Sequence, residues 1–209
     1  MGPREPRLYD GRMRLIGEID PARPLLVVAV AEEAAHLGRE LPVLLTGMGK
    51  VNASAALAAV LARGPHPSEV VNLGTAGALR PGLEGTTHEV GTVLQHDLDT
   101  DVLRTLTGET VGAPLTLDLR DGAADGLVLA TGDLFVAEES ARQRLAERAH
   151  LVDMEGYAVA SAARAAGVPV RLVKHVSDEA VEGAAKTWRE SVDACAQLLA
   201  LWARQEFGH

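Results

Sequence analysis

Apolar runs of strand length recur along this chain, and segments with a helical pattern separate them. Such continuous runs are typical of strands that are covered on both faces of a sheet. Glycines or short polar clusters bound most of them, which marks the ends of the elements. The predicted strands are residues 25–31, 42–50, 69–79, 89–97 and 126–133, the start of 151–167, and 168–178.

Helical patterns fill most of the intervals between these runs. The predicted helices are residues 32–41, 51–64, 138–150, the later part of 151–167, and 185–207. Alternation of buried strands with helices favours an α/β fold around a largely parallel sheet. Residues 1–24 are rich in charge and proline, and we expect an N-terminal arm or an irregular edge segment there. Residues 25–209 are then a single α/β domain.

Acids and glycines recur just after the predicted strands. In open α/β sheets, ligands bind outside the carboxyl ends of the strands. Several polar strand ends should therefore form one candidate site. The residues at these ends are Glu32, Glu33, Gly47, Gly49, Gly74, Gly77, Gly132, Asp133, Asp153, Glu155, Ser177 and Asp178.

The pair Asp153 and Glu155 stands at the mouth of an alanine-rich helix. Acids suit the first turn of a helix, because the unpaired N–H groups there carry partial positive charge. The alternative is that a ligand binds at this junction. The convergence of several acidic strand ends on one sheet edge favours the second interpretation for Glu155, whereas Asp153 could simply support the turn.

Composition narrows the class of protein. The 209 residues have a formal net charge of −9, which argues against a general nucleic-acid surface. The single cysteine excludes an intramolecular disulfide and a cysteine-based zinc site. No apolar run approaches ~20 residues, so no membrane span is expected. The first residues lack the apolar stretch of a signal peptide, and we expect a cytoplasmic protein.

Two local motifs indicate little by themselves. "TGMGK" has fewer glycines and a shorter spacing than a phosphate-binding P-loop, which favours a tight strand-to-helix turn. "HDLD" contains metal-ligand residue types but lacks partner clusters, so we expect no metal and no other cofactor. His36 and His175 are expected to be structural. Taken alone, Asp178 could be an N-cap.

Seven ordered motifs identify a family. They are "AVAEEA", "TGMGKVNAS", "NLGTAGAL", "HDLD", "TGDLF", "VDMEG" and "VSD", and the resemblance that they carry covers residues 25 to about 205. The chain resembles the purine nucleoside phosphorylase and nucleosidase superfamily, specifically the 5′-methylthioadenosine/S-adenosylhomocysteine nucleosidases. That resemblance implies a three-layer α/β/α fold with a mixed central sheet, a purine nucleoside as substrate and a homodimer.

The resemblance also implies the roles of three carboxylates. Glu33 matches the glutamate that acts on the attacking water, and Glu155 matches the one that grips the ribose hydroxyls. Asp178 matches the acid that assists protonation of the purine ring at N7. Carboxyl groups suit N-glycosidic hydrolysis, because carboxylates stabilise the positive charge that develops on the sugar. The attacking water also needs a proton acceptor, and the departing purine needs a proton donor.

Five further positions follow from the same motifs as substrate-binding residues. Met154 matches a methionine packed against the sugar, and Thr75 keeps the hydroxyl of a family serine. Phe135 matches the ring that stacks on the base, and Val136 the residue whose backbone hydrogen-bonds to it. Ser177 stands beside Asp178 in "VSD" and is expected at the same pocket.

Hydrolysis is favoured over phosphorolysis by the absence of two arginines. Phosphorylases that share the pattern use arginines for phosphate, since a guanidinium matches its oxygens. Asn72 occupies one of these arginine positions here. The other position lies in the first loop, which reads "AVAEEA" and is acidic, so it would repel phosphate. Four alternatives stay open: a purine nucleoside phosphorylase, a futalosine-type hydrolase, another purine nucleosidase, and a non-catalytic nucleoside-binding protein.

Departures from the family pattern concern the 5′ end of the substrate. Residues 100–130 are fewer than the family usually has, and an expected helix could be missing there. Lys174 replaces a common arginine, and Tyr157 follows the ribose glutamate. The 5′ substituent and the preferred base are therefore not fixed by the sequence.

Overall fold

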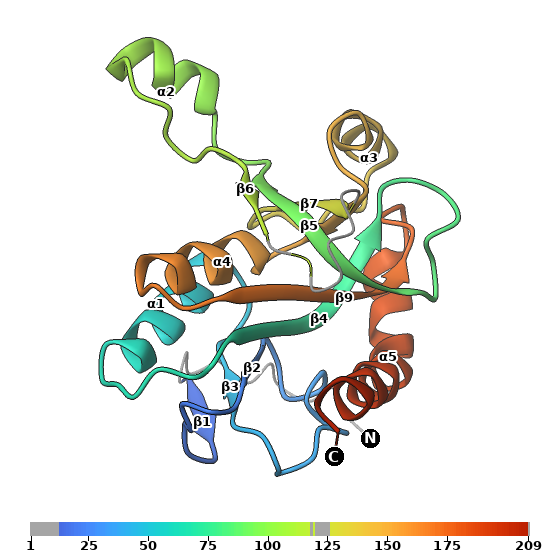
Figure 1. The fold of residues 1–209 in the computed structure, drawn as a ribbon. Helices are drawn as coiled ribbons and strands as arrows, with labels where there is room; N and C mark the ends of the chain where they lie inside the picture. Colours follow the sequence, from blue (N-terminus) through green and yellow to red (C-terminus); the bar gives the residue numbers. More distant parts are fainter. Residues whose placement is uncertain (1–12, 118, 120–125, 209) are drawn as a thin grey trace, which may run out of the picture.

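A mixed sheet runs through the molecule and carries helices on both faces (Figure 1). The computed structural model describes residues 13–117, 119 and 126–208. Within these ranges the sheet has nine strands. They are β1 Arg14–Ile16, β2 Leu25–Val28, β3 Val43–Leu45, β4 Val70–Ala78, β5 Thr87–Gln95, β6 Leu115–Thr116, β7 Leu127–Thr131, β8 Leu151–Asp153 and β9 Val170–Asp178. The predicted α/β class with a mixed sheet is confirmed.

Strand pairing bends part of the sheet back on itself. β2 pairs in parallel with β3 and β4, and β4 pairs in parallel with β9. β9 then pairs antiparallel with β5, β5 pairs in parallel with β7, and β7 in parallel with β8. β8 returns to the far end of β4 in an antiparallel pair. This closed path brings the carboxyl ends of β8 and β9 to the carboxyl-terminal part of β4, where Gly77 pairs with both Val152 and Asp178.

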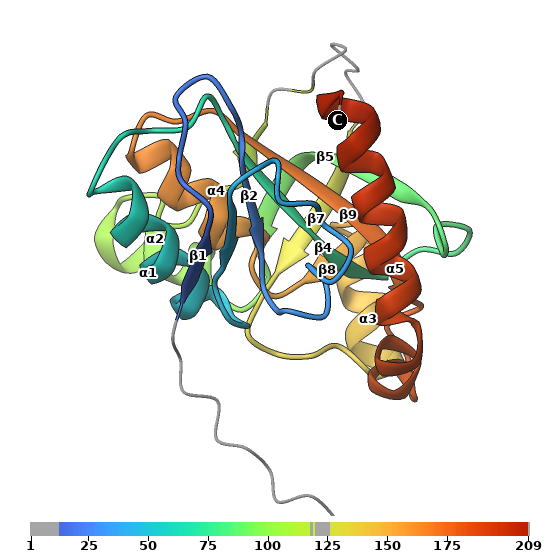
Figure 2. The ribbon, with the colours of Figure 1, turned by 90° about the horizontal axis from the view of Figure 1, so that it is seen from below.

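The described residues form five helices. These are α1 Lys50–Leu61, α2 Thr100–Thr107, α3 Glu139–Ala146, α4 Gly156–Ala165 and α5 Ala184–Phe207. Figures 1 and 2 show α1 and α4 on one face of the β2–β4–β9 region and α5 on the opposite face. No helix of these ranges is long and apolar enough to cross a membrane.

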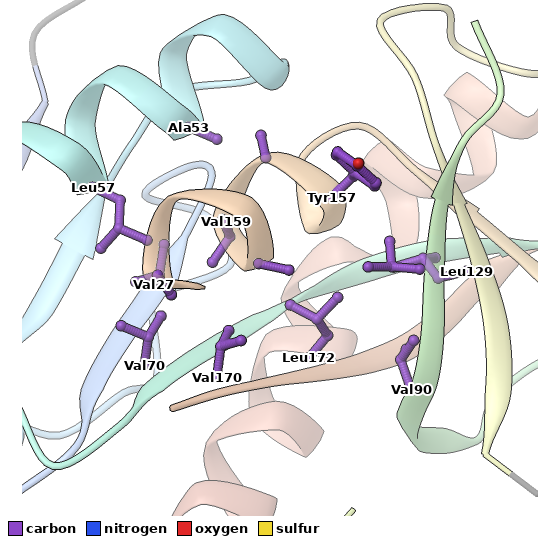
Figure 3. Packing of buried hydrophobic residues seen from close by; sticks show 14 of the residues in the cluster. Val27, Ala53, Leu57, Val70, Val90, Leu129, Tyr157, Val159, Val170 and Leu172 are labelled. Carbon is purple, nitrogen blue, oxygen red and sulfur yellow. The ribbon is translucent and has the colours of Figure 1, made fainter. Parts of the chain in front are cut away.

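The core is built from aliphatic side chains that alternate along the strands. Val70 belongs to the cluster under α1 and α4, whereas its neighbour Val71 belongs to the cluster under α5. Figure 3 shows Leu57 of α1 and Val159 of α4 over strand residues such as Val27 and Val70. Alanines on both helices, such as Ala53 and Ala160, are fully buried and allow close packing despite the scarcity of aromatic residues.

The helix predicted over residues 32–41 is wrong. The chain makes turns there, with hydrogen bonds from Ala35 N–H to the Glu32 carbonyl and from Leu37 N–H to the Ala34 carbonyl. The local pattern could support a helix, but the Glu33 side chain points inward and accepts the N–H and the hydroxyl of Thr75, 42 positions later in the chain. Tertiary hydrogen bonds of this kind override local helix propensity.

Two other segments contain secondary structure that the sequence did not predict, one after "HDLD" and one in the N-terminal arm. The segment after "HDLD" does contain a helix, α2, which Asp99 caps by accepting the N–H of Val102. Within the predicted N-terminal arm, β1 pairs antiparallel with β3 at the edge of the sheet. Residues 1–12 of that arm lie outside the described residues, and the boundary at residue 25 stays a prediction.

Candidate active site

A cavity of about 260 Å³ opens at the carboxyl ends of β2, β8 and β9, beside β4. All eight residues that the sequence selected line it: Glu33, Thr75, Phe135, Val136, Met154, Glu155, Ser177 and Asp178. Met48, Leu134, Trp188 and Arg189 also line it, and sequence reasoning assigned them no role. Four of the predicted strand-end acids therefore meet in one pocket, Glu33, Asp153, Glu155 and Asp178, whereas Glu32 and Asp133 do not line it.

Glu33 is held in place by three hydrogen-bond donors. Its Oε1 accepts the N–H and the hydroxyl of Thr75, at 2.8 and 2.9 Å, and its Oε2 accepts the N–H of Ala29 at 3.3 Å. The residue is only 5% exposed. Gly74 leaves the room for this approach, because a Cβ there would lie 3.3 Å from Oε1 of Glu33. The carboxylate is therefore fixed in the wall of the cavity.

Glu155 reaches across the pocket instead of capping its own helix. It precedes α4, but its side chain makes no capping hydrogen bond there. Its Oε1 accepts the N–H of Gly49, in the turn after β3, at 2.7 Å. Burial, and then the nearby charge of Asp153, raise the pKa of Glu155 to about 8. A buried carboxyl with so high a pKa is typical of functional sites.

Asp153 stabilises the turn between β8 and α4, as its position at this strand-to-helix junction suggested. Its Oδ2 accepts the N–H of Gly156 at 2.8 Å, and its Oδ1 accepts the hydroxyl of Thr131 at 2.6 Å. Lys174 forms an ion pair with it at 2.9 Å. These contacts fix the turn from β8 into α4, and that turn carries Met154 and Glu155 into the cavity.

Lys174 is a fully buried cation beneath the carboxylates. It is 1% exposed, and its Nζ donates to Oδ1 of Asn72 at 2.8 Å as well as pairing with Asp153. Burial alone would lower its pKa, but the charges of Asp153 and Glu155 outweigh burial and raise it. Sequence reasoning noted Lys174 only as a departure, yet the repeated acids around it were a signal that a buried cation is needed.

Asp178 ends β9 at the other side of the cavity. Its Oδ1 accepts the N–H of Ala180 at 2.9 Å, and its Oδ2 accepts the hydroxyl of Ser177 at 2.8 Å. Burial raises its pKa, although these two hydrogen bonds oppose the shift. Because α5 begins only at Ala184, Asp178 is not its N-cap.

The loop after β7 also lines the pocket, through Leu134, Phe135 and Val136. Val136 is buried, whereas the ring of Phe135 is 48% exposed. A half-exposed aromatic ring at the lip of a cavity offers a flat apolar face to a planar ligand. This placement is compatible with the stacking role that the family resemblance implies for Phe135.

In the "HDLD" segment, Asp97 binds other residues of the protein. Asp97 forms a short ion pair with Lys50 at 2.5 Å and accepts the N–H of Asp133 at 2.9 Å. Across the described ranges, no three His, Cys, Asp or Glu side chains are grouped so that they could hold a metal ion. The segment thus braces the turn that precedes α1.

Comparison with known proteins identifies the family. The family model described as "Phosphorylase superfamily" matches residues 34–203. The chain belongs to the phosphorylase superfamily. Within this superfamily it is 28% identical over 193 residues to a 5′-methylthioadenosine/S-adenosylhomocysteine nucleosidase of Marinomonas sp., covering 80% of each chain. It is 29% identical to the same enzyme of Geobacillus thermodenitrificans, covering 77% of this chain and 75% of the relative. The predicted family resemblance is confirmed.

Solved structures of superfamily members share the fold. The futalosine hydrolase of Helicobacter pylori superposes with a TM-score of 0.76 at 22% identity, over 88% of this chain and 96% of that one. A mutant of the Helicobacter pylori enzyme MTAN, with 5′-methylthioadenosine in its active site, gives a TM-score of 0.73 at 22% identity, over 88% and 97% of the two chains. These neighbours establish a common architecture for this superfamily member.

The raised pKa of Glu155 predicts a specific pH dependence of stability. Between about pH 4.5 and about pH 8 the folded protein holds a proton on Glu155 that the unfolded chain has released. The free energy of unfolding should therefore fall as pH rises through this window. Glu155→Gln cannot ionise, so its thermal midpoint should decline less between these limits. Parallel pH profiles of the midpoint for the two proteins, measured without ligand, would contradict the burial of an ionisable Glu155.

Proposed function

We propose that this protein hydrolyses the N-glycosidic bond of a purine nucleoside, with 5′-methylthioadenosine or S-adenosylhomocysteine as the first substrates to test. The products are the free base and the ribose derivative. The observation that carries the proposal is that Glu33, Glu155 and Asp178 all line one cavity. The nucleosidase relatives support the same enzyme class.

Hydrolysis needs a base for water, and Glu33 is suited to that role. It is fixed by Ala29 and Thr75 in the cavity wall. In the proposed reaction, the water oxygen forms a bond to C1′ of the ribose while the bond from C1′ to the purine nitrogen breaks. Glu33 accepts the water proton, and the electron pair of the broken bond moves into the purine ring.

The leaving base accepts that electron pair more readily when its ring is protonated. We assign to Asp178 the assistance of protonation at N7, and its raised pKa supports this role because it favours the protonated carboxyl. Phe135 would stack on the ring, and the backbone of Val136 would hydrogen-bond to it. Ser177 hydrogen-bonds to Asp178 and orients its carboxyl group.

Glu155 is proposed to hold the ribose hydroxyls, with Met154 packed against the sugar. Both residues line the cavity next to each other. Hydroxyl donors stabilise an ionised carboxylate, so substrate binding would favour ionisation of Glu155. The resulting negative charge lies where positive charge develops on the ribose in the transition state.

Hydrolysis is favoured over phosphorolysis because Glu33 already accepts the hydrogen-bond donors around Thr75. The N–H and hydroxyl of Thr75 and the N–H of Ala29 all donate to Glu33. They are therefore engaged by a carboxylate of the protein and not presented to an anion. Asn72, where phosphorylases would place an arginine, donates to the carbonyl of Val27 and accepts from Lys174.

The test of this function is a panel of purine nucleosides in phosphate-free buffer. The panel contains 5′-methylthioadenosine, S-adenosylhomocysteine, futalosine, adenosine and inosine, and chromatography measures the free base. Futalosine is included because the futalosine hydrolase of Helicobacter pylori shares the fold. Release of base from one of them supports the proposal. Ligand binding without turnover of any of them would indicate a nucleoside-binding protein instead.

The scaffold we infer for this activity is a three-layer α/β/α homodimer in the cytoplasm. Support for the layers comes from α1 and α4 on one face of the sheet and α5 on the other (Figure 2). Support for a dimer comes from α2, which buries none of its own residues and leaves Leu106 75% exposed. A second copy covering this helix would remove that apolar side chain from water. Light scattering that gives a monomer mass would contradict the dimer.

A further inference from the structure

The indole of Trp188 makes a hydrogen bond inside the cavity wall. Trp188 lies in the first turns of α5, and its Nε1 donates to the hydroxyl of Thr75 at 2.8 Å. The Thr75 hydroxyl in turn donates to Oε1 of Glu33 at 2.9 Å. A three-residue chain thus runs from the terminal helix, through β4, to the proposed base.

The direction of this chain is fixed by the donor at its end. An indole N–H can only donate, so the oxygen of Thr75 must accept from Trp188. A hydroxyl has one hydrogen, and the hydrogen of Thr75 is then left to point at the carboxylate of Glu33. Without Trp188, the hydroxyl could rotate toward other acceptors or accept from a water molecule.

We propose that Trp188 is a positioning residue for the water-activating carboxylate and acts through the hydroxyl of Thr75. This inference rests on the proposed role of Glu33 and adds to it a link to α5. Because Glu33 accepts hydrogen bonds from Thr75 and Ala29, loss of an oriented hydroxyl loosens its attachment at Thr75. The effect should fall on the chemical step and not on the binding of the nucleoside.

The test is a double-mutant cycle with Trp188→Phe and Thr75→Val, assayed on the best substrate of the wild type. Phenylalanine keeps an aromatic ring but lacks the N–H donor, and valine keeps the shape of threonine without the hydroxyl. Trp188→Phe should lower kcat about 2- to 10-fold, the amount expected for one net hydrogen bond, with KM little changed. In the Thr75→Val background, Trp188→Phe should cause no further loss of kcat.

The control is Trp202→Phe, at the other tryptophan of the same helix, which contacts Arg171 and Phe207 away from the cavity. Its kcat should equal that of the wild type, and circular dichroism should show that every variant is folded. Equal losses from Trp188→Phe in both backgrounds would overturn the proposal, since Trp188 would then act only by packing. An unchanged kcat in Trp188→Phe would overturn it as well. If the wild type releases no base from any nucleoside, the proposed function itself has failed.

Discussion

Asp178→Asn should lower the turnover of purine nucleosides by ~10²- to 10⁴-fold, the usual contribution of a general acid. The substitution keeps the shape of the side chain, and the asparagine can still accept the N–H of Ala180. An amide, however, cannot deliver a proton to N7 of the leaving base. Steady-state kinetics should therefore show a fall in kcat, while a non-hydrolysable nucleoside analogue still binds by calorimetry.

A ribose derivative with a good leaving group separates this role from general damage. Nitrophenolate leaves without protonation, so a nitrophenyl riboside that the wild type accepts should lose much less turnover in Asp178→Asn than a purine nucleoside does. Asp193→Asn is the matched control, because Asp193 is an exposed acid on α5 that pairs with His36. If Asp178→Asn lowered turnover of both substrates equally, Asp178 would not be the acid of the leaving base.

Glu33→Gln should lower turnover by a similar factor of ~10²- to 10⁴, because water then lacks its base. The structure adds a second cost to this substitution. Both oxygens of Glu33 face donors, so the new NH₂ group must point at the N–H of Ala29 or at the two donors of Thr75. Stopped assays of base release should show the loss in kcat.

The neighbouring acid offers the matched control for Glu33. Glu32→Gln removes the same charge from an exposed side chain one residue earlier, and its turnover should equal that of the wild type. Differential scanning calorimetry should show whether Glu33→Gln is folded at the assay temperature. Near wild-type turnover in folded Glu33→Gln would mean that another group activates the water, and the proposed mechanism would be wrong.

The sequence predicted the elements that carry the pocket because their signals are local. Apolar runs ending in glycines or acids marked β2, β4 and β9, and the motif "VDMEG" placed Glu155 where a strand meets a helix. The family resemblance then selected eight residues, and all of them line one cavity. Their chemical roles stay predictions until the variants are measured.

Contacts between distant segments were what the sequence could not supply. In the turns over residues 32–41, hydrogen bonds from Thr75, 42 positions later, hold Glu33 inward, and helix propensity contains no information about them. Lys174 has its partners at Asn72 and Asp153, one across a parallel pair and the other on a different strand. Trp188 lies 113 positions from Thr75, so only the folded chain shows that they are bonded.

In the proposed reaction water, and not phosphate, attacks the ribose. The most direct measurement is the identity of the sugar product when the best substrate reacts in phosphate buffer, followed by phosphorus magnetic resonance and chromatography. We expect free base and an unphosphorylated ribose derivative, formed at the same rate with and without phosphate. A ribose 1-phosphate product whose formation requires phosphate would contradict it.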